Sequence, residues 1–136
     1  MSYADVLDGL HARFQTIAGL TVIKGEPASI QTNKILYSDF MGCTREHVGT
    51  TVRVTYRSRH RLCIKWGERE NVEEQLAELV NAVPIAIESS PHLGGQTRGQ
   101  ATITTGEPGW VTIGQTDCRS CDFVSEVLEV GPVGTL

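Results

Sequence analysis

The stretch TTVRVTYRSRHRLCIKW, residues 50–66, decides the fold because its side chains alternate in character along its whole length. One set of alternate positions is mostly apolar and comprises Val52, Val54, Tyr56, Ser58, His60, Leu62, Ile64 and Trp66. The other set is mostly cationic and comprises Arg53, Thr55, Arg57, Arg59, Arg61, Cys63 and Lys65. A period of two predicts one long β-strand, or two with a bend near Ser58. At about 3.3 Å per residue a single strand over these residues would span roughly 50 Å, which is longer than a domain of this size is expected to be wide. Part of the strand is therefore expected to project from the domain.

The charges around this strand divide the chain into a basic and an acidic segment. Between Arg45 and Arg69 there are seven Lys and Arg but two acids, whereas the region from Glu68 to Glu88 has six Glu and one Arg. Three interpretations stay open: Arg–Glu pairs within one molecule, each worth under about 1 kcal/mol, a head-to-tail contact between copies, and contact with DNA phosphates. The candidate interface residues are Arg53, Arg57, Arg59, Arg61, Lys65, Glu73, Glu74 and Glu78.

Two segments have the periodicity of amphipathic helices. The first is expected from Ser2 to Leu20, with Ser2 and Asp5 forming its N-terminal cap. The second is expected to begin at Asn71, with Glu74 completing a pair like a capping box. Pro84 is expected to kink or end this second helix, because proline lacks the backbone N–H that a helix needs.

The remaining segments indicate short strands, turns and one loop. Residues 39–49 have no clear period and are interpreted as a loop, and Pro91–Gly95 and Gly114–Gln115 as turns. The turn residues Glu107–Pro108–Gly109 predict a further turn between two strands. The expected short strands are residues 21–23, 35–37, 100–105 and 110–113, followed by a strand with a break over 117–130. Helices and strands thus come in blocks, which predicts an α+β domain with a mainly antiparallel sheet, two helices on one face and a projecting strand or hairpin.

Length and composition limit the class of protein. The 136 residues suit one domain over 1–136, with 131–136 as a flexible tail. The net charge of -4 argues against a wholly basic nucleic-acid binder, and 21% charged residues argue against a disordered chain. No apolar run is long enough for a membrane helix, and the start MSYADVLDGL lacks a basic segment typical of a signal peptide. We therefore expect a protein of a reducing compartment, without a membrane partner, whose cysteines are free thiols.

No arrangement of residues indicates catalysis. Cys118 and Cys121 have C-x-x-C spacing, but on a regular strand they would point to opposite faces. The histidines are scattered, and neither a nucleophile elbow nor a working pair of carboxylates is present. We expect no enzyme, catalytic residue, metal or cofactor. A small metal-binding enzyme using Cys118, Cys121 and His47 is the less favoured alternative.

Several segments together resemble the tail terminator, or tail-to-head joining, proteins of long-tailed bacteriophages, a family of minor tail proteins. The resemblance covers most of the chain, except residues 38–49. The matching segments are YADVLDGLHARF (3–14), VRVTYRSRHRLCIKW (52–66), NVEEQLAELVNAVPIAIESSPHLGG (71–95), GEPGWVTIGQ (106–115) and CDFVSEVLEV (121–130).

The resemblance implies a small α+β subunit of a homohexameric ring in the tail-neck region of a virion, assembled in the host cytoplasm. Such a ring caps the tail tube, stops its polymerisation, joins the head connector or stopper proteins and lets genomic DNA pass through its channel. The strand 52–66 and the loop 39–49 are the expected contacts, and charge reversal at Arg57, Arg59 and Arg61 is expected to weaken the ring but not the monomer. A tail-completion or head-closure neck protein is the nearest alternative.

Overall fold

The computed structural model describes residues 2–66, 71–95 and 99–136. Within these residues, two helices, a short 3₁₀ helix and five strands follow one another in blocks, as expected for an α+β domain. The elements are α1 (Tyr3–Phe14), β1 (Thr21–Ile23), β2 (Lys34–Val48), β3 (Thr51–Lys65), α2 (Val72–Glu88), η1 (Leu93–Gly95), β4 (Ala101–Ile113) and β5 (Thr116–Pro132). None of the helices in the described residues is long and apolar enough to cross a membrane.

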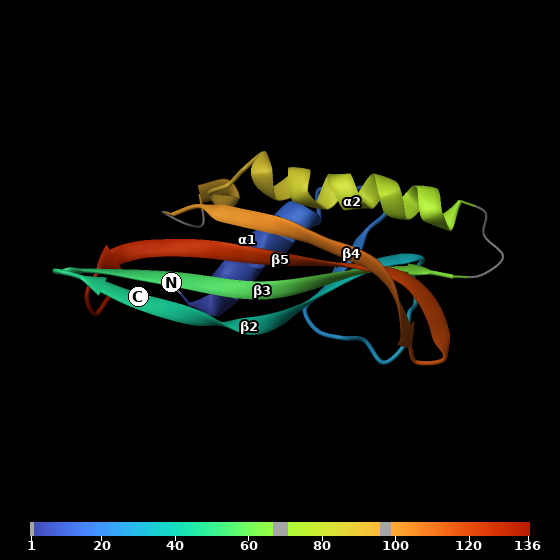
Figure 1. The fold of residues 1–136 in the computed structure, drawn as a ribbon, viewed down its shortest axis with the longest axis horizontal. Helices are drawn as coiled ribbons and strands as arrows, with labels where there is room; N and C mark the ends of the chain where they lie inside the picture. The colour runs from blue at the N-terminus through green and yellow to red at the C-terminus, as the bar shows by residue number, and fades with distance from the viewer. Residues whose placement is uncertain (1, 67–70, 96–98) are drawn as a thin grey trace.

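The strands form one sheet in the order β1-β2-β3-β5-β4. Only the short β1 pairs in parallel, with residues 35–37 of β2, and all other neighbours are antiparallel. The long strand expected from the sequence is β3, which lies at the centre and pairs along its length with β2 and β5. Figure 1 shows that the turn between β2 and β3 lies at the narrow end of the molecule, beyond the helices, so the expected projecting hairpin is present.

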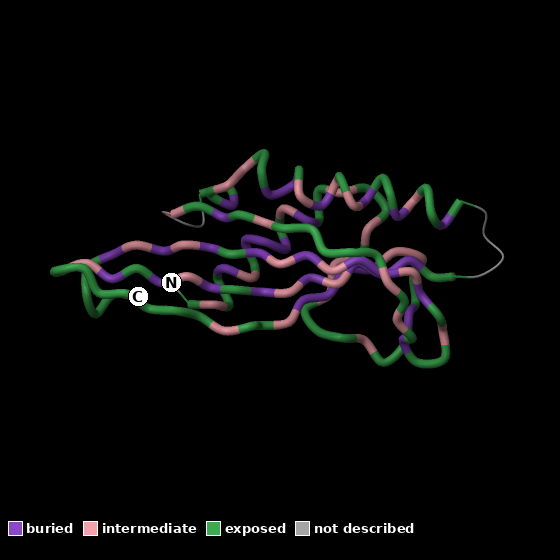
Figure 2. The backbone as a smooth tube through the Cα atoms, in the orientation of Figure 1, coloured by how far each residue is buried: buried purple, intermediate pink, exposed green. Residues whose placement is uncertain are grey.

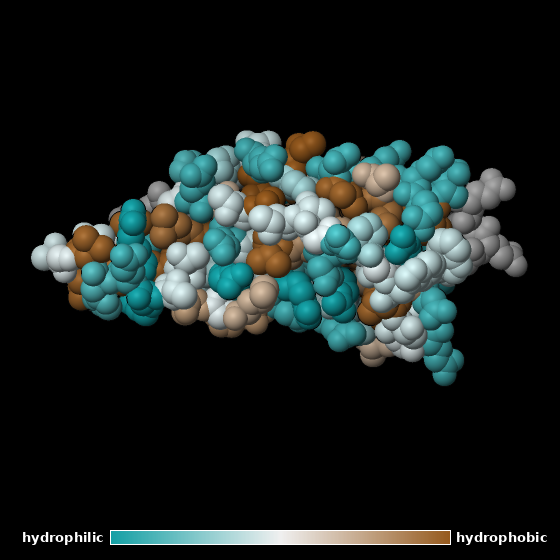
Figure 3. All heavy atoms as spheres, viewed as in Figure 1, coloured by the Kyte–Doolittle hydropathy of each residue, from teal (hydrophilic) through white to brown (hydrophobic). Residues whose placement is uncertain are grey.

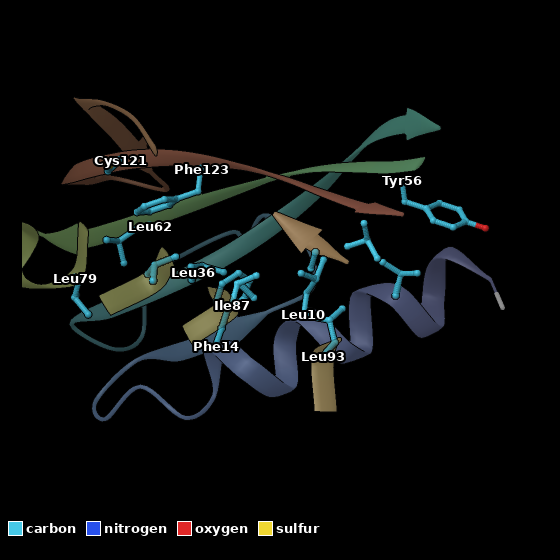
Figure 4. Packing of buried hydrophobic residues seen from close by; sticks show 14 of the residues in the cluster. Leu10, Phe14, Leu36, Tyr56, Leu62, Leu79, Ile87, Leu93, Cys121 and Phe123 are labelled. Carbon is cyan, nitrogen blue, oxygen red and sulfur yellow. The ribbon is translucent and has the colours of Figure 1, made fainter. Parts of the chain in front are cut away.

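Both helices pack on the same face of the sheet, as predicted. α1 crosses behind the strands in Figure 1, and α2 runs beside β4. The apolar positions of β3 point into this layer and are buried, except for Trp66, which lies after the strand and is exposed. Figure 4 shows side chains from both helices and three strands meeting in this core. Its fully buried members include Leu10, Phe14, Leu36, Leu62, Ile87 and Phe123.

A second, smaller cluster covers part of the opposite face. It lies beneath the connection between β1 and β2, which passes close to the β4–β5 turn. Its buried residues are Ile30, Ile35, Tyr37, Cys63, Ile113 and Cys118. Beyond this cluster, no helix of the described part of the chain lies over the face that carries the arginines of β3. Burial is greatest where the strands cross the helices and decreases toward the β2–β3 turn (Figure 2).

The helix limits partly differ from those expected. Ser2 and Asp5 do form a capping box, but α1 ends at Phe14 rather than Leu20. Beyond Phe14 the chain forms tighter turns, with Ile17 N donating to the Phe14 carbonyl at 3.0 Å. The hydroxyl of Thr16 also donates to the Arg13 carbonyl at 2.6 Å, a bond that competes with helix continuation.

The second helix corrects two expectations. Asn71 has a left-handed backbone with φ of 70°, and its side chain makes no capping hydrogen bond, so the expected box with Glu74 is wrong. An N-cap side chain requires an extended backbone to reach the next N–H groups. Pro84 does not end α2, which continues to Glu88. The proline removes one hydrogen bond near the end of the helix, while the following Ala86 and Ile87 are buried in the core.

Residues 39–49 are not a loop, because β2 extends to Val48. A β-bulge between Phe40 and Gly42 shifts the register against β3. Even-numbered residues face the helices before the bulge, and odd-numbered residues face them after it, so the sequence period of two is lost. Gly42 has φ of 122°, a conformation that favours glycine. Cys43 to Val48 are exposed on both faces, which also removes the hydrophobic alternation.

The C-terminal half likewise has longer strands than expected. The predicted turn at Glu107–Pro108–Gly109 is wrong, because a register shift between Thr105 and Pro108 accommodates these residues within β4. A Cβ at Gly106 would lie 2.9 Å from the Asp122 carbonyl oxygen, so this close approach of strands requires glycine. β5 has no break. It also includes residues 131 and 132, which were assigned to a flexible tail.

Candidate assembly surfaces

The uncovered face of the sheet carries a ladder of ion pairs. Three arginines of β3 that were predicted as interface residues each meet an acid on the same face, supplied by β2 or β5. The shortest nitrogen–oxygen distances are 3.1 Å for Arg57–Glu126, 2.6 Å for Arg59–Asp39 and 2.7 Å for Arg61–Asp122. Figure 3 shows this face as predominantly hydrophilic, with smaller hydrophobic areas between. This face thus carries many charged side chains, and within each of the three pairs the positive and negative charges cancel.

Arg61 is the most firmly held of the three. Its Nε and Nη2 atoms donate to both carboxylate oxygens of Asp122, at 2.7 and 3.0 Å. This hydrogen bonding raises the pKa of the guanidinium above its ordinary value, while partial burial opposes the rise. Pairs of this kind at half-exposed positions contribute little each to stability, typically about 0.2–1 kcal/mol. Their larger consequence is that the arginines already have partners.

This pairing changes two expectations. Charge reversal at Arg57, Arg59 and Arg61 would break three pairs within the monomer, so the variant would not report on a ring alone. Contact with DNA phosphates is not favoured by cations that adjacent carboxylates neutralise. Arg53 and Lys65 enter none of the ion pairs within the described ranges.

The predicted acidic residues lie on the other side of the sheet, in the helix layer. Glu73 at the start of α2 accepts from Arg119 of β5 at 2.7 Å. Glu74 and Glu78 are exposed on α2. The structure therefore does not bring the arginines of β3 and the glutamates of α2 together within one chain. Glu68, Arg69 and Glu70, which were counted in the charge pattern, lie outside the described residues.

Two tryptophans form an exposed aromatic cluster that was not predicted. The rings of Trp66 and Trp110 meet edge to face at 5.0 Å, and 44% and 58% of these residues is exposed. The Arg119 guanidinium lies 5.0 Å from the Trp110 ring and is anchored by Glu73 and the Gly109 carbonyl. Tryptophan and arginine held rigidly at a surface are typical of protein interfaces. The sequence could have pointed to this cluster, because Trp66 and Trp110 are the two tryptophans of the chain and this residue type is enriched at interfaces.

A chain of hydrogen bonds crosses the buried side of the sheet. His11 Nε2 lies 2.8 Å from Ser38 Oγ, which lies 2.7 Å from His60 Nδ1. His60 Nε2 then lies 2.7 Å from Ser125 Oγ. Burial lowers the pKa of His11 to about 4 and that of His60 to about 3, so both rings are neutral at pH 7. This network joins α1 to three strands. From the sequence, His60 was expected in the apolar set of positions of β3, and its hydrogen-bond partners were not predicted.

The residues of the alternative metal-binding interpretation do not converge. Cys118 belongs to the small cluster on one face of the sheet and Cys121 to the helix-side core, so their expected opposite orientation is confirmed. Burial raises the pKa of both thiols, which disfavours the thiolate form that binds metals. His47 lies far along β2, near its end. Over the described ranges, no group of three or more His, Cys, Asp or Glu could hold a metal ion.

Comparison with known proteins shows a likeness of fold. No protein-family model matches the sequence, and no curated protein matches it. A solved structure that matches is the sheath/tube terminator of PVC, an extracellular contractile injection system, in its extended state. The likeness has a TM-score of 0.53 at 12% sequence identity, and it covers 99% of this chain and 58% of that chain. The fold implied by the resemblance to tail terminators is therefore confirmed.

Proposed function

We propose that this chain is a tail terminator. Copies of it form a ring on the end of a tail tube, stop further addition of tube subunits and present a surface to the head connector or stopper proteins. The observation that carries the proposal is the fold shared with a sheath/tube terminator over 99% of the chain. The sequence segments that resemble phage terminators are a second, independent support. The resemblance implies six copies, a channel for genomic DNA and a place in the tail neck of a virion assembled in the host cytoplasm.

The proposed mechanism is structural and involves no covalent chemistry. A growing tube presents the same surface after each round of addition, so polymerisation ends only when that surface is covered by one that no further tube subunit fits. The terminator does this by binding the tube with one side of its ring. The exposed Trp66–Trp110 cluster has the composition of such a contact, because aromatic and arginine side chains concentrate binding energy at interfaces.

Removal of the protein tests the proposal. Tails made in cells that lack the coding sequence are expected to be longer and more variable in length than normal, because no ring covers the growing end. Tail lengths measured by negative-stain electron microscopy check this, and resupply of the protein from a plasmid should restore the normal length. Tails of normal length that fail to join heads would contradict the proposal and favour the alternative head-closure or tail-completion role.

A further inference from the structure

The outer edge of β2 is a long row of backbone groups without a strand partner among the described residues. β1 pairs with residues 35–37 of β2, so from Ser38 to Val48 the strand has β3 on one side and, within residues 2–66, 71–95 and 99–136, no strand on the other. Figure 1 shows this part of β2 at the lower edge of the sheet, with none of the labelled helices or strands of the described residues beyond it. Phe40, Met41 and Val48 lie along it with about half of each residue exposed.

The backbone hydrogen bonds between β2 and β3 show which backbone groups of β2 point outward. Lys65 N donates to the Asn33 carbonyl, which makes these opposite residues a hydrogen-bonded pair. Hydrogen-bonded and non-bonded pairs alternate in an antiparallel ladder, so odd-numbered residues of β3 bond to β2. Their partners after the bulge are Gly42, Thr44, Glu46 and Val48. The N–H and C=O groups of Cys43, Arg45 and His47 therefore point away from the sheet.

The two edges of the sheet are protected to different degrees. β4, at the opposite edge, contains Pro108 and a bulge, and its Ala101 N–H is occupied by the Pro91 carbonyl. The bond to Ala101 closes the start of the β4 edge, and the bulge with Pro108 interrupts the edge at one point, while the exposed residues on either side of the bulge, up to Thr112, stay available for pairing. β2 has no proline, and after its bulge it runs regularly to Val48. An unprotected edge of this length is suited to accept another strand by backbone hydrogen bonds.

Strand directions identify which strand suits this edge. β2, β3, β5 and β4 alternate in direction, so β2 and β4 of one chain run in opposite directions. In a ring whose axis lies roughly along the strands, rotation preserves these directions. The β4 edge of the next copy would then meet β2 antiparallel, and each copy would have both edges covered. Pairing of β2 with β2 across a two-fold axis would instead leave β4 uncovered and stop at two copies.

We infer that the free edge of β2 in one copy pairs with the β4 edge of the next, so that the sheets continue from subunit to subunit. This inference rests on the proposed ring-forming function and adds the surfaces that close the ring. Contact on β4 involves its exposed middle and end, from Thr104 to Thr112, because Ala101 at its start is already bonded. The partner strand comes from a second copy of this chain.

Cross-linking distinguishes the two ways of pairing. Cys43 lies on the β2 edge and is exposed, whereas Cys63, Cys118 and Cys121 are buried. Cysteines are introduced singly at Thr104 and Thr112, and the full-length variants are treated with a short bis-maleimide at increasing protein concentration. At least one variant is expected to give a ladder of linked chains beyond the dimer, with the wild type staying unlinked. Dimers in the wild type, or no ladder from either variant, would overturn the inference.

A proline on β2 provides an independent check. Arg45→Pro removes an outward N–H and leaves the β2–β3 ladder intact, so the monomer should keep its circular dichroism spectrum but fail to associate by light scattering. Arg45→Ala is the matched control, because it removes the same side chain, including its bond to the Leu136 carbonyl, and keeps the N–H. The control is expected to associate like the wild type. Equal association of the proline variant would contradict the inference.

These results separate the inference from the proposed function. If Arg45→Pro still limits tail length and still forms a ring, the edge pairing is wrong and the terminator function stands. If removal of the wild-type protein leaves tail length unchanged, the terminator function fails. A cross-linked ladder would in that case still show that copies pair through these edges.

Discussion

Replacing Phe14 with alanine is expected to lower the free energy of unfolding by about 3–5 kcal/mol, as for other buried phenylalanines. Phe14 is the last residue of α1 and is fully buried, and its ring meets that of His60 edge to face at 4.9 Å. It therefore fixes α1 to the centre of β3. Domains of this size have total stabilities of about 5–15 kcal/mol, so the loss is a large fraction. Urea denaturation at pH 7, followed by circular dichroism, measures it.

Ile85 offers a matched control for this measurement. It is also a large apolar residue of a helix, but 58% of it is exposed on α2. Ile85→Ala is expected to change stability by no more than about 0.5 kcal/mol. A loss below about 1 kcal/mol for Phe14→Ala would show that α1 does not pack on the sheet as described.

Acid is expected to destabilise the monomer through the buried histidines. Burial holds the pKa of His11 at about 4 and that of His60 at about 3, below the ordinary value of 6.5 that applies in the unfolded chain. The unfolded state therefore binds more protons as the pH falls below 6.5. The stability that the neutral rings contribute is present above pH 6.5 and decreases progressively toward pH 4 and pH 3. Between pH 7 and pH 4 the free energy of unfolding should fall by at least about 2 kcal/mol.

Histidine variants separate this effect from the titration of carboxylates. His60→Asn is expected to be less stable at pH 7, because it alters the bonds to Ser38 and Ser125, but to show a shallower decrease between pH 6.5 and pH 4. His47→Asn, at an exposed position of β2, is the matched control variant outside this hydrogen-bond network. Urea midpoints at several pH values measure both. If the free energy of unfolding of His60→Asn decreased between pH 6.5 and pH 4 as steeply as that of the wild type, this network would not govern acid sensitivity.

Much of the fold could be predicted because β3 and the helix faces carry their periods without interruption. Val52 to Ile64 alternate strictly and lie at the centre of the sheet, where burial on one face preserves the pattern. The first turn of α1 was also predictable, because its capping box is local in sequence. These signals suffice for the fold class and for the placement of the helices on one face.

The remaining elements depend on contacts that are distant in sequence. The bulge at Met41 changes which residues of β2 face the core, so the strand has no single period to detect. Pro108 and the glycines around it are typical of a turn, yet pairing with β5 holds them in β4. In both cases tertiary pairing overrides the local signal.

The candidate surfaces were only partly predictable for the same reason. Arg61 was recognised as part of a charged face, but its partner Asp122 lies 61 residues away on β5. The sequence therefore indicated the position of the charge and not its neutralisation. Residues 39–49 were expected to make contacts, but as a loop; that they form a free strand edge was missed, because an edge consists of backbone groups and leaves no mark on residue type.

The most direct test of the proposed ring is a cryo-electron microscopy reconstruction of the end of the tail tube that joins the head. We expect a closed ring of copies of this fold on the last tube ring, six by the resemblance to phage terminators, and no such ring on tubes made without the protein. A well-resolved tube end without the ring, in particles that contain the protein, would contradict it.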